Sequence, residues 1–295
     1  MAKDHDTVWD RVAQTTVRGL RSGVLQPIAT RSEMVEDGGI SFVVREVSSL
    51  AHKAKAKRAE GQVSNPFLPP YEPDLLVGEI SSTHVGMLNR YNVVSHHLLV
   101  VTRAFVDQRA ALDEADFAAL LACMSEGACL GFYNGGEEAG ASQPHKHLQV
   151  VPLPPAPSGP AVPLGPLLSS SVEAGFAEAL PFVHALAPVD PAWFGPSPDA
   201  AAVLARYRAL LAELGMDVDA RGWVGPYNLL FTRQWMLVVP RSREHVDGMS
   251  LNALAFAGAL LVKNAAEMAR VKARGPMGVL AAAGVPRGYQ PACQL

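Results

Sequence analysis

A loop of small residues runs into a predicted strand within the stretch Gly140-Ala141-Ser142-Gln143-Pro144-His145-Lys146-His147-Leu148-Gln149. The proline stops a helix from extending through the loop, and the apolar run that follows is typical of a strand. Side chains alternate along a strand, so His145, His147 and Gln149 share one face and Leu148 points the other way. Two imidazoles and a carboxamide make a poor core surface, but they suit the binding and attack of an anion.

The composition indicates a globular chain with ample material for a core, because 49% of its 295 residues are hydrophobic and 18% are charged. A formal net charge of -3 argues against a sequence-independent grip on nucleic acid, which needs a basic surface. The three cysteines have no C-x-x-C spacing, so neither a disulfide framework nor a zinc knuckle is expected. We find no apolar signal core and no run long enough to span a bilayer, and predict a cytoplasmic protein without a membrane partner.

Hydrophobic periodicity and turn residues give a coarse map of the elements. Helices are predicted over residues 6–25, 111–130, 198–214 and 252–263. Strands are predicted over 40–47, 75–80, 93–101, 147–153, 227–232 and 235–241, the last two as an antiparallel hairpin. Loops or connections are predicted over 84–91 and 152–166, and the tail 275–286 has little pattern.

One internal similarity bears on domain organisation. The segment 98–103 resembles the segment 236–241, and each follows a Tyr-Asn pair, Tyr91-Asn92 and Tyr227-Asn228. Two related halves would produce this pattern, and so would chance similarity between two buried strands. We predict an α+β fold with an antiparallel sheet and packed helices, forming a single catalytic domain over 1–295. The N-terminal half, about 1–155, carries the histidine row, and the C-terminal half covers about 170–295.

The histidine row favours nucleophilic catalysis over metal binding. A neutral imidazole can attack phosphorus when its other N–H is held in place. Ser142, Gln143 and the loop amides from Gly140 onward would be donors for the phosphate. Gln149 can donate to a phosphate oxygen but cannot activate water, so the pattern leans toward group transfer over hydrolysis. A catalytic metal lacks an evident third ligand, since glutamine is a poor zinc ligand.

The stretch 140–149 closely resembles the active-site motif of the ATP adenylyltransferases, or diadenosine tetraphosphate phosphorylases. These enzymes belong to the histidine triad superfamily, on the branch of galactose-1-phosphate uridylyltransferase. Further matching segments lie between about residues 40 and 287; they are Asn65-Pro66-Phe67, Leu88-Asn89-Arg90-Tyr91, Tyr227-Asn228-Leu229-Leu230 and Trp235-Met236-Leu237-Val238-Val239-Pro240-Arg241.

The resemblance implies a histidine-triad-like fold and a reaction in which diadenosine tetraphosphate and phosphate give ATP and ADP, or the reverse, through an adenylyl-histidine. It makes His147 the nucleophile. The remaining positions it implies bind substrate; they are Lys53, Asn89, Arg90, Asn134, Gly140, Ala141, Ser142, Gln143, His145, Gln149, Asn228, Thr232, Met236 and Arg241. Lys55 and Lys57 compete with Lys53 as the phosphate-binding lysine, and Arg90 stands where the family pattern has lysine.

Two rival functions stay open at this point. A hexose-1-phosphate uridylyltransferase would use the same nucleophile with a different base and sugar, and a nucleotide-binding module would not turn over. The expected partners are small molecules, namely diadenosine tetraphosphate, ATP, ADP and phosphate. The resemblance implies no resident metal or cofactor, and it leaves open whether Mg²⁺ accompanies the nucleotide phosphates.

Overall fold

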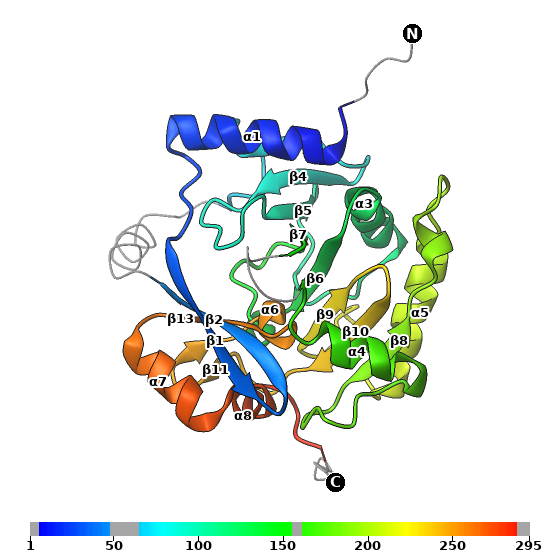
Figure 1. The fold of residues 1–295 in the computed structure, drawn as a ribbon. Helices are drawn as coiled ribbons and strands as arrows, with labels where there is room; N and C mark the ends of the chain where they lie inside the picture. The colour runs from blue at the N-terminus through cyan, green and yellow to red at the C-terminus, as the bar shows by residue number, and fades with distance from the viewer. Residues whose placement is uncertain (1–5, 48–64, 155–160, 288–295) are drawn as a thin grey trace.

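A computed structural model describes residues 6–47, 65–154 and 161–287. Within these residues, eight strands form one antiparallel sheet in the order β3-β4-β5-β7-β6-β9-β10-β8 (Figure 1). The strands are β3 Leu76–Glu79, β4 His84–Leu88, β5 Leu98–Thr102, β6 Cys129–Gly135, β7 His147–Pro152, β8 Ala185–Pro188, β9 Tyr227–Phe231 and β10 Trp235–Pro240. Residues from both halves of the chain therefore share one sheet, which confirms the predicted α+β class.

The two faces of the sheet bury separate cores. The helices α1, α3 and α5 contribute to one core, which also receives Leu148 and Val150 of β7. The helices α4, α6, α7 and α8 contribute to the other, which receives Val151. Their bounds are α1 Val8–Ser22, α3 Glu114–Met124, α4 Gly165–Ser171, α5 Ala200–Glu213, α6 Ala253–Phe256, α7 Ala265–Arg274 and α8 Pro276–Ala283. Since side chains alternate along β7, His147 and Gln149 lie on the face that Val151 shares, as predicted.

A smaller sheet packs on the His147 face. The strands β1 (Thr30–Asp37) and β2 (Ile40–Val47) form an antiparallel hairpin, and β13 (Ala259–Val262) pairs with β2 in parallel. The hairpin turns at Gly38 and Gly39, whose φ angles of 58° and 78° suit a tight two-residue connection. Figure 1 shows this hairpin running beside α7 and α8, close to the short pair β11 (His245–Val246) and β12 (Met249–Ser250).

The two halves of the chain meet in the large sheet at the antiparallel pair of β6 and β9, in which Asn134 is the Cα partner of Asn228. On one side β6 pairs with β7, and on the other β9 pairs with β10. The strand β10 therefore occupies the position that β7 occupies in the first half, and Trp235 begins β10 as His147 begins β7. The internal sequence similarity instead matches β10 to residues 98–103, which form β5 and the residue after it. β5 lies one strand further from β6 than β7 does.

Several predicted elements are confirmed, namely the helices near 6–25 and 198–214, the strands at 40–47 and 147–153, and the hairpin at 227–241. Others are wrong. The predicted loop 84–91 contains β4, the strand predicted from 93 begins only at Leu98, and the helix predicted to 130 ends at Met124. In each case the strand is fixed by a neighbour distant in sequence, such as β5 for β4 and β9 for β6.

The C-terminal segment deviates most from the sequence expectations. The predicted helix 252–263 is divided into α6 and β13 by Gly258, whose φ of 94° ends the helical turn. The tail, predicted to have little pattern, forms α8, and the connection 152–166 includes the buried side chains of Val162 and Leu164. Apolar content alone did not separate a buried strand from a buried helix.

Candidate active site

The first candidate residue is His147, whose side chain is only 4% exposed. Its Nδ1 lies 2.8 Å from the main-chain oxygen of His145, which can only accept a hydrogen bond. Nδ1 therefore carries the proton, and Nε2 presents a lone pair. Burial lowers the pKa of His147 to about 4; the hydrogen bond that Nδ1 donates to the His145 carbonyl works against this shift, and the nearby His145 ring adds to it. The ring is therefore a neutral nucleophile near pH 7.

His145 is fully buried and has both ring nitrogens occupied. Nε2 donates to the main-chain oxygen of Thr102 at 2.7 Å, and Nδ1 accepts from the side-chain amide of Asn65 at 3.0 Å. Phe67 packs against both histidine rings, with centroid separations of 5.9 Å to His145 and 5.0 Å to His147. The Asn-Pro-Phe segment noted in the sequence thus fixes the two rings, and His145 supports His147 through its main-chain carbonyl.

Gln108 joins β6 and β7 where their direct pairing stops. The last paired residues are Phe132 and Gln149, so the same register sets Asn134 opposite His147. There the Gln108 carboxamide replaces the direct hydrogen bonds between the two strands. Its Oε1 accepts from the main-chain amide of His147 at 2.8 Å, and its Nε2 donates to the main-chain oxygens of Asn134 at 2.9 Å and of His147 at 3.2 Å. Gln108 thus separates the two strands at the level of His147.

A hydrogen-bonded chain orients Gln149. Its Oε1 lies 2.9 Å from Nε2 of His97, and Nδ1 of His97 lies 3.3 Å from the amide nitrogen of Asn89. Asn89 donates, so His97 carries its proton on Nε2 and donates to Gln149. Burial lowers the pKa of His97 to about 4, so the ring stays neutral. This arrangement leaves the amide N–H groups of Gln149 available, since no partner for them lies among the described residues.

The side chain of Asn134 lies on the same face, opposite His147. Its Oδ1 accepts from Nδ2 of Asn228 and from the amide of Ala253, each at 2.9 Å. Arg241 in turn donates to Oδ1 of Asn228 at 2.6 Å. The structure thus brings Asn228 against Asn134, and Asn134 lies opposite His147.

In the loop before β7, some main-chain amides donate hydrogen bonds within the loop itself. The amides of Gly140 and Ala141 bond to the oxygens of Glu137 and Gly136, at 2.8 and 3.1 Å. Gly140 also lies tightly against residues 251–252, where an added Cβ would approach the oxygen of Leu251 to 2.5 Å. Gly140 and Ala141 therefore shape the loop through these contacts. Ser142 and Gln143 follow at an exposed and a half-buried position.

Lys146, between the two histidines, points to the opposite face of the sheet. Its ammonium group pairs with Asp116 and donates to the Ala111 oxygen at 2.9 Å. Asp116 also accepts from His84 at 3.0 Å and caps the start of α3 through the amide of Asp113 at 2.8 Å. Although burial opposes ionisation, these hydrogen bonds and the lysine charge lower the pKa of Asp116. A buried ion pair therefore anchors the strand that begins at His147.

Two predicted substrate residues, Met236 and Thr232, make contacts inside the protein, and a third, Arg90, lies nearer the surface. Met236 packs into the core behind the sheet, on the face opposite His147, and Thr232 caps the turn between β9 and β10. Arg90 is partly exposed beside Glu72, with a separation of 3.9 Å between the charged atoms. Lys53, Lys55 and Lys57 fall outside the described residues.

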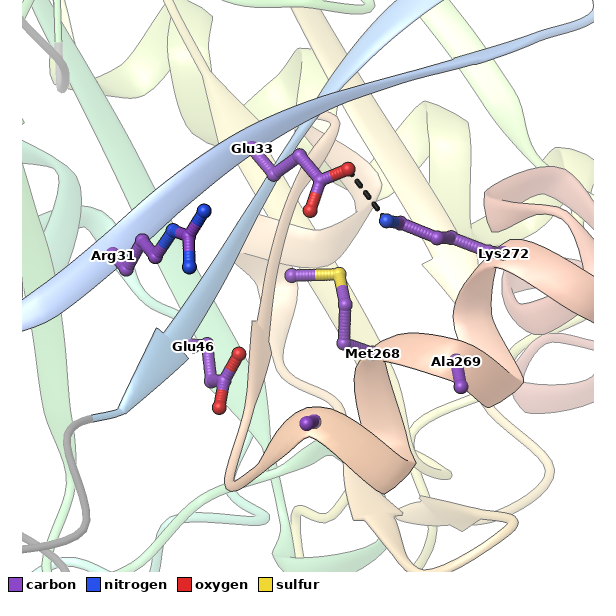
Figure 2. A pocket seen from close by; sticks show the side chains of 7 residues that line it. Arg31, Glu33, Glu46, Met268, Ala269 and Lys272 are labelled. Atoms are coloured by element: carbon purple, nitrogen blue, oxygen red, sulfur yellow. Dashed lines mark ion pairs between the residues drawn. The ribbon is translucent and has the colours of Figure 1, made fainter.

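A separate hollow of about 270 Å³ lies between β1, β2 and α7, away from the histidine row (Figure 2). Its charged side chains offset one another, since Glu33 pairs with Lys272 at 2.5 Å and Arg31 faces Glu46 across the hairpin. Its described lining is Arg31, Glu33, Glu46, Ala265, Met268, Ala269 and Lys272. It includes none of the predicted site residues.

Comparison with known proteins assigns the chain to a family. Residues 1–170 match the model of the Ap4A phosphorylase N-terminal domain, which is more than half of the chain. The chain belongs to the Ap4A phosphorylase family. Residues 178–286 match the ATP adenylyltransferase C-terminal domain, so the two matches cover both parts of the sheet.

Similar members of the Ap4A phosphorylase family come from Saccharomyces cerevisiae. Diadenosine 5',5'''-P1,P4-tetraphosphate phosphorylase 2 is 27% identical over 84% of this chain and 85% of its own length. Protein APA1 is 26% identical over 82% and 83%. The fold matches the crystal structure of yeast Ap4A phosphorylase Apa2 in complex with AMP, with a TM-score of 0.79, 23% identity and coverage of 97% of this chain and 99% of that one.

Sequence reasoning missed two residues of this Ap4A phosphorylase site. His97 was visible as one of two histidines before an apolar strand, and its position at the start of β5 was the available signal. Gln108 gave no signal, because its role depends on three partners distant in sequence.

Among the described residues, no helix is both long and apolar enough to cross a membrane.

Proposed function

We propose that this chain is a nucleotidyltransferase that converts diadenosine tetraphosphate and phosphate into ATP and ADP through an adenylyl group on Nε2 of His147. The observation that carries the proposal is the tautomer of His147. A buried ring with Nδ1–H held by a carbonyl and a pKa of about 4 keeps an unprotonated Nε2 at neutral pH. Membership in the Ap4A phosphorylase family supports the choice of substrate.

In the first step, the Nε2 lone pair attacks the α-phosphorus and forms a P–N bond. The bond from that phosphorus to the bridging oxygen breaks, and ATP leaves with the electron pair. The ring becomes positively charged, and the His145 carbonyl continues to accept the Nδ1 proton at 2.8 Å. The amide nitrogens of Gln149 and Asn134 would donate to the phosphate oxygens as their charge develops.

In the second step, an oxygen of orthophosphate attacks the adenylyl phosphorus, the P–N bond breaks and ADP leaves. Two in-line displacements retain configuration at phosphorus. Gln149 has no proton to exchange near neutral pH, so it would hold the phosphate without activating water. We therefore propose that the intermediate waits for a phosphate-bearing acceptor and that hydrolysis is slow.

The remaining assignments belong to the same proposal. Ser142, Gln143, Asn89 and Arg90 would contact the nucleotide or its phosphates, and the upstream lysine would be Lys53. We propose that both halves act as one catalytic unit, because β6 of the first half pairs with β9 of the second within one sheet. We also propose a cytoplasmic location, which fits the free, buried thiols of Cys123 and Cys129.

The test is to trap the intermediate. Wild-type protein is incubated with diadenosine tetraphosphate in the absence of phosphate, denatured at high pH, and analysed by mass spectrometry of its peptides. We expect an AMP adduct on His147, lost when phosphate is added before the quench. The His147→Ala variant should form no adduct and show no turnover, because no other group replaces the nucleophile. An adduct on another residue, or turnover in that variant, would refute the proposal.

A further inference from the structure

All the N–H groups of the Arg241 guanidinium donate hydrogen bonds to other groups of the protein. Its Nε donates to the Ala283 oxygen at 3.2 Å, and Nη1 donates to the Ala139 oxygen at 3.1 Å and to Oδ1 of Asn228 at 2.6 Å. Nη2 donates to the oxygens of Arg243 and Leu251 at 2.8 and 3.0 Å. All five N–H groups of the guanidinium are therefore used. A side chain in this state has no donor left for a substrate phosphate.

Arg241 sets the direction of every hydrogen bond beyond it. Arginine only donates, so the atom of Asn228 that faces it must be an oxygen. Nδ2 of Asn228 then faces the other way and donates to Oδ1 of Asn134 and to the Ala139 oxygen, each at 2.9 Å. The assignment of nitrogen and oxygen in both carboxamides thus follows from the chemistry of one arginine.

The orientation of Asn134 is fixed twice. Its Oδ1 accepts from Asn228 and also from the main-chain amide of Ala253, at 2.9 Å, and an amide can only donate. Both lone pairs of that oxygen are occupied. The two N–H groups of Asn134 remain on the side away from Asn228, and no partner for them lies among the described residues.

We propose that Arg241 and Asn228 are positioning residues, which hold the carboxamide of Asn134 with its nitrogen toward the reacting phosphate. This inference rests on the proposed function, and it replaces the expectation that Arg241 and Asn228 contact substrate. These hydrogen bonds run from the C-terminal half to the N-terminal half of the sheet. Arg241 follows β10, Asn228 lies on β9, and Asn134 lies on the neighbouring β6. The C-terminal half thereby contributes to chemistry at His147 without reaching the substrate.

The hydrogen bonds from Arg241 through Asn228 to Asn134 matter because a carboxamide without such partners can flip and exchange the places of its nitrogen and oxygen. With its oxygen toward the phosphate, Asn134 would repel the charge that develops during transfer; with its nitrogen there, it stabilises that charge. A donor fixed before the reaction needs no rearrangement during it, which is the basis of electrostatic preorganisation. Hydrogen bonds in series also polarise one another in a buried site, so the arginine charge strengthens the terminal donor.

The decisive variant is Asn228→Asp, which keeps the size of the side chain and gives Arg241 a carboxylate partner. It removes the donor to Asn134 and sets a carboxylate against its Oδ1, so the carboxamide is drawn to turn its nitrogen toward residue 228, against the single remaining donor, the Ala253 amide. We expect kcat for adenylyl transfer to fall by about 100-fold, the effect of losing one fixed donor, while KM changes little. Thermal denaturation should show a folded protein. Asn264→Asp, at an exposed helix cap, is the matched control and should behave as wild type.

A double-mutant cycle separates positioning from general structural support. Asn134→Ala removes the terminal donor; Asn228→Asp should then cause no further loss of kcat in that background. A further loss of kcat in that background would overturn the proposal, as would a single Asn228→Asp variant with wild-type kcat. If Asn228→Asp does not fold, Asn228→Ser is used in the same cycle, because its hydroxyl is too short to reach Asn134. Wild-type protein that forms no His147 adduct would instead contradict the proposed function itself.

Discussion

The imidazole of His147 combines a fixed proton with an unprotonated, inward-facing nitrogen. The main-chain carbonyl of His145 supplies the first property, and burial supplies the second by lowering the pKa to about 4. A solvent-exposed histidine, with an ordinary pKa near 6.5, would be partly protonated in weakly acidic solution. Burial of the ring therefore extends the pH range in which it can attack phosphorus.

The pH dependence of adenylyl transfer follows from this shift. Protonation of Nε2 removes the nucleophile, so the rate should fall as pH decreases through about 4 and not through 6.5. The measurement is the rate of ATP release in a single turnover without phosphate, which isolates the first step from the titration of orthophosphate. An acid limb centred near 6.5 would show that the ring is more accessible to water than the structure indicates.

The proposed mechanism makes Gln149 responsible for the fate of the adenylyl intermediate. Replacing it with histidine, Gln149→His, introduces a group that can accept a proton from water, so we expect hydrolysis of the adenylyl group to increase relative to phosphorolysis. Product analysis gives the ratio of AMP to ADP formed from the same enzyme sample. An unchanged ratio would mean that the carboxamide does not protect the intermediate.

At the scale of elements, the active site depends on a gap between β6 and β7 that a side chain fills. Gln108 satisfies the amide and carbonyl of His147 and the carbonyl of Asn134 within the protein. The hydroxyl of Tyr133 also holds Gln108, because it donates to the main-chain oxygen of Gln108 at 2.5 Å. The backbone of the nucleophile is thus fixed by a residue that lies on neither strand.

Removing this carboxamide should affect both stability and rate. Gln108→Leu leaves buried backbone groups without partners, at a cost of roughly 1–3 kcal/mol for each group, so we expect the free energy of unfolding to fall by at least ~2 kcal/mol. Urea denaturation measures it, with exposed Gln14→Leu as the control. Because His147 loses its backbone support, adenylyl transfer should also slow. Unchanged stability would mean that water replaces the carboxamide.

The sequence predicted the local part of this arrangement. Alternation along β7 correctly placed His147 and Gln149 on one face, because it requires only a strand. It could not predict that Met236 faces the other core or that Arg241 is saturated, since both facts depend on how β10 pairs with β9 and β8. For the same reason the pattern predicts a helix over the residues of β13, although they form a strand paired with the distant β2.

At the scale of the whole molecule, buried neutral histidines link folding to pH. His97 and His147 have a pKa of about 4 when folded, against 6.5 for an exposed side chain. Both rings lie on the same face of the sheet and are desolvated by the surrounding core. Each takes up a proton when the chain unfolds between these pH values, so the folded state loses stability as pH falls from 6.5 toward 4.

The expected size of this effect is measurable. The two protons taken up by His97 and His147 on unfolding contribute a slope of ~2.7 kcal/mol per pH unit near pH 5, at about 1.4 kcal/mol for each proton. His145 and His184, whose pKa values burial also lowers, add to this slope. Urea denaturation at a series of pH values provides the slope, and His97→Gln should lower it by ~1.4 kcal/mol per pH unit. A free energy of unfolding that is constant from pH 6.5 to 4.5 would contradict the buried, neutral state of these rings.

The tryptophan that begins β10 occupies the place at which a second histidine row would begin. Trp235 fills the core at the place equivalent to His147, with 2% of its surface exposed. Substituting histidine for this tryptophan would open a void and bury an imidazole without a partner, and both would lower the stability of the fold. A second nucleophile therefore cannot be installed on β10 by one substitution, and any redesign of that strand for catalysis has to refill the core around it.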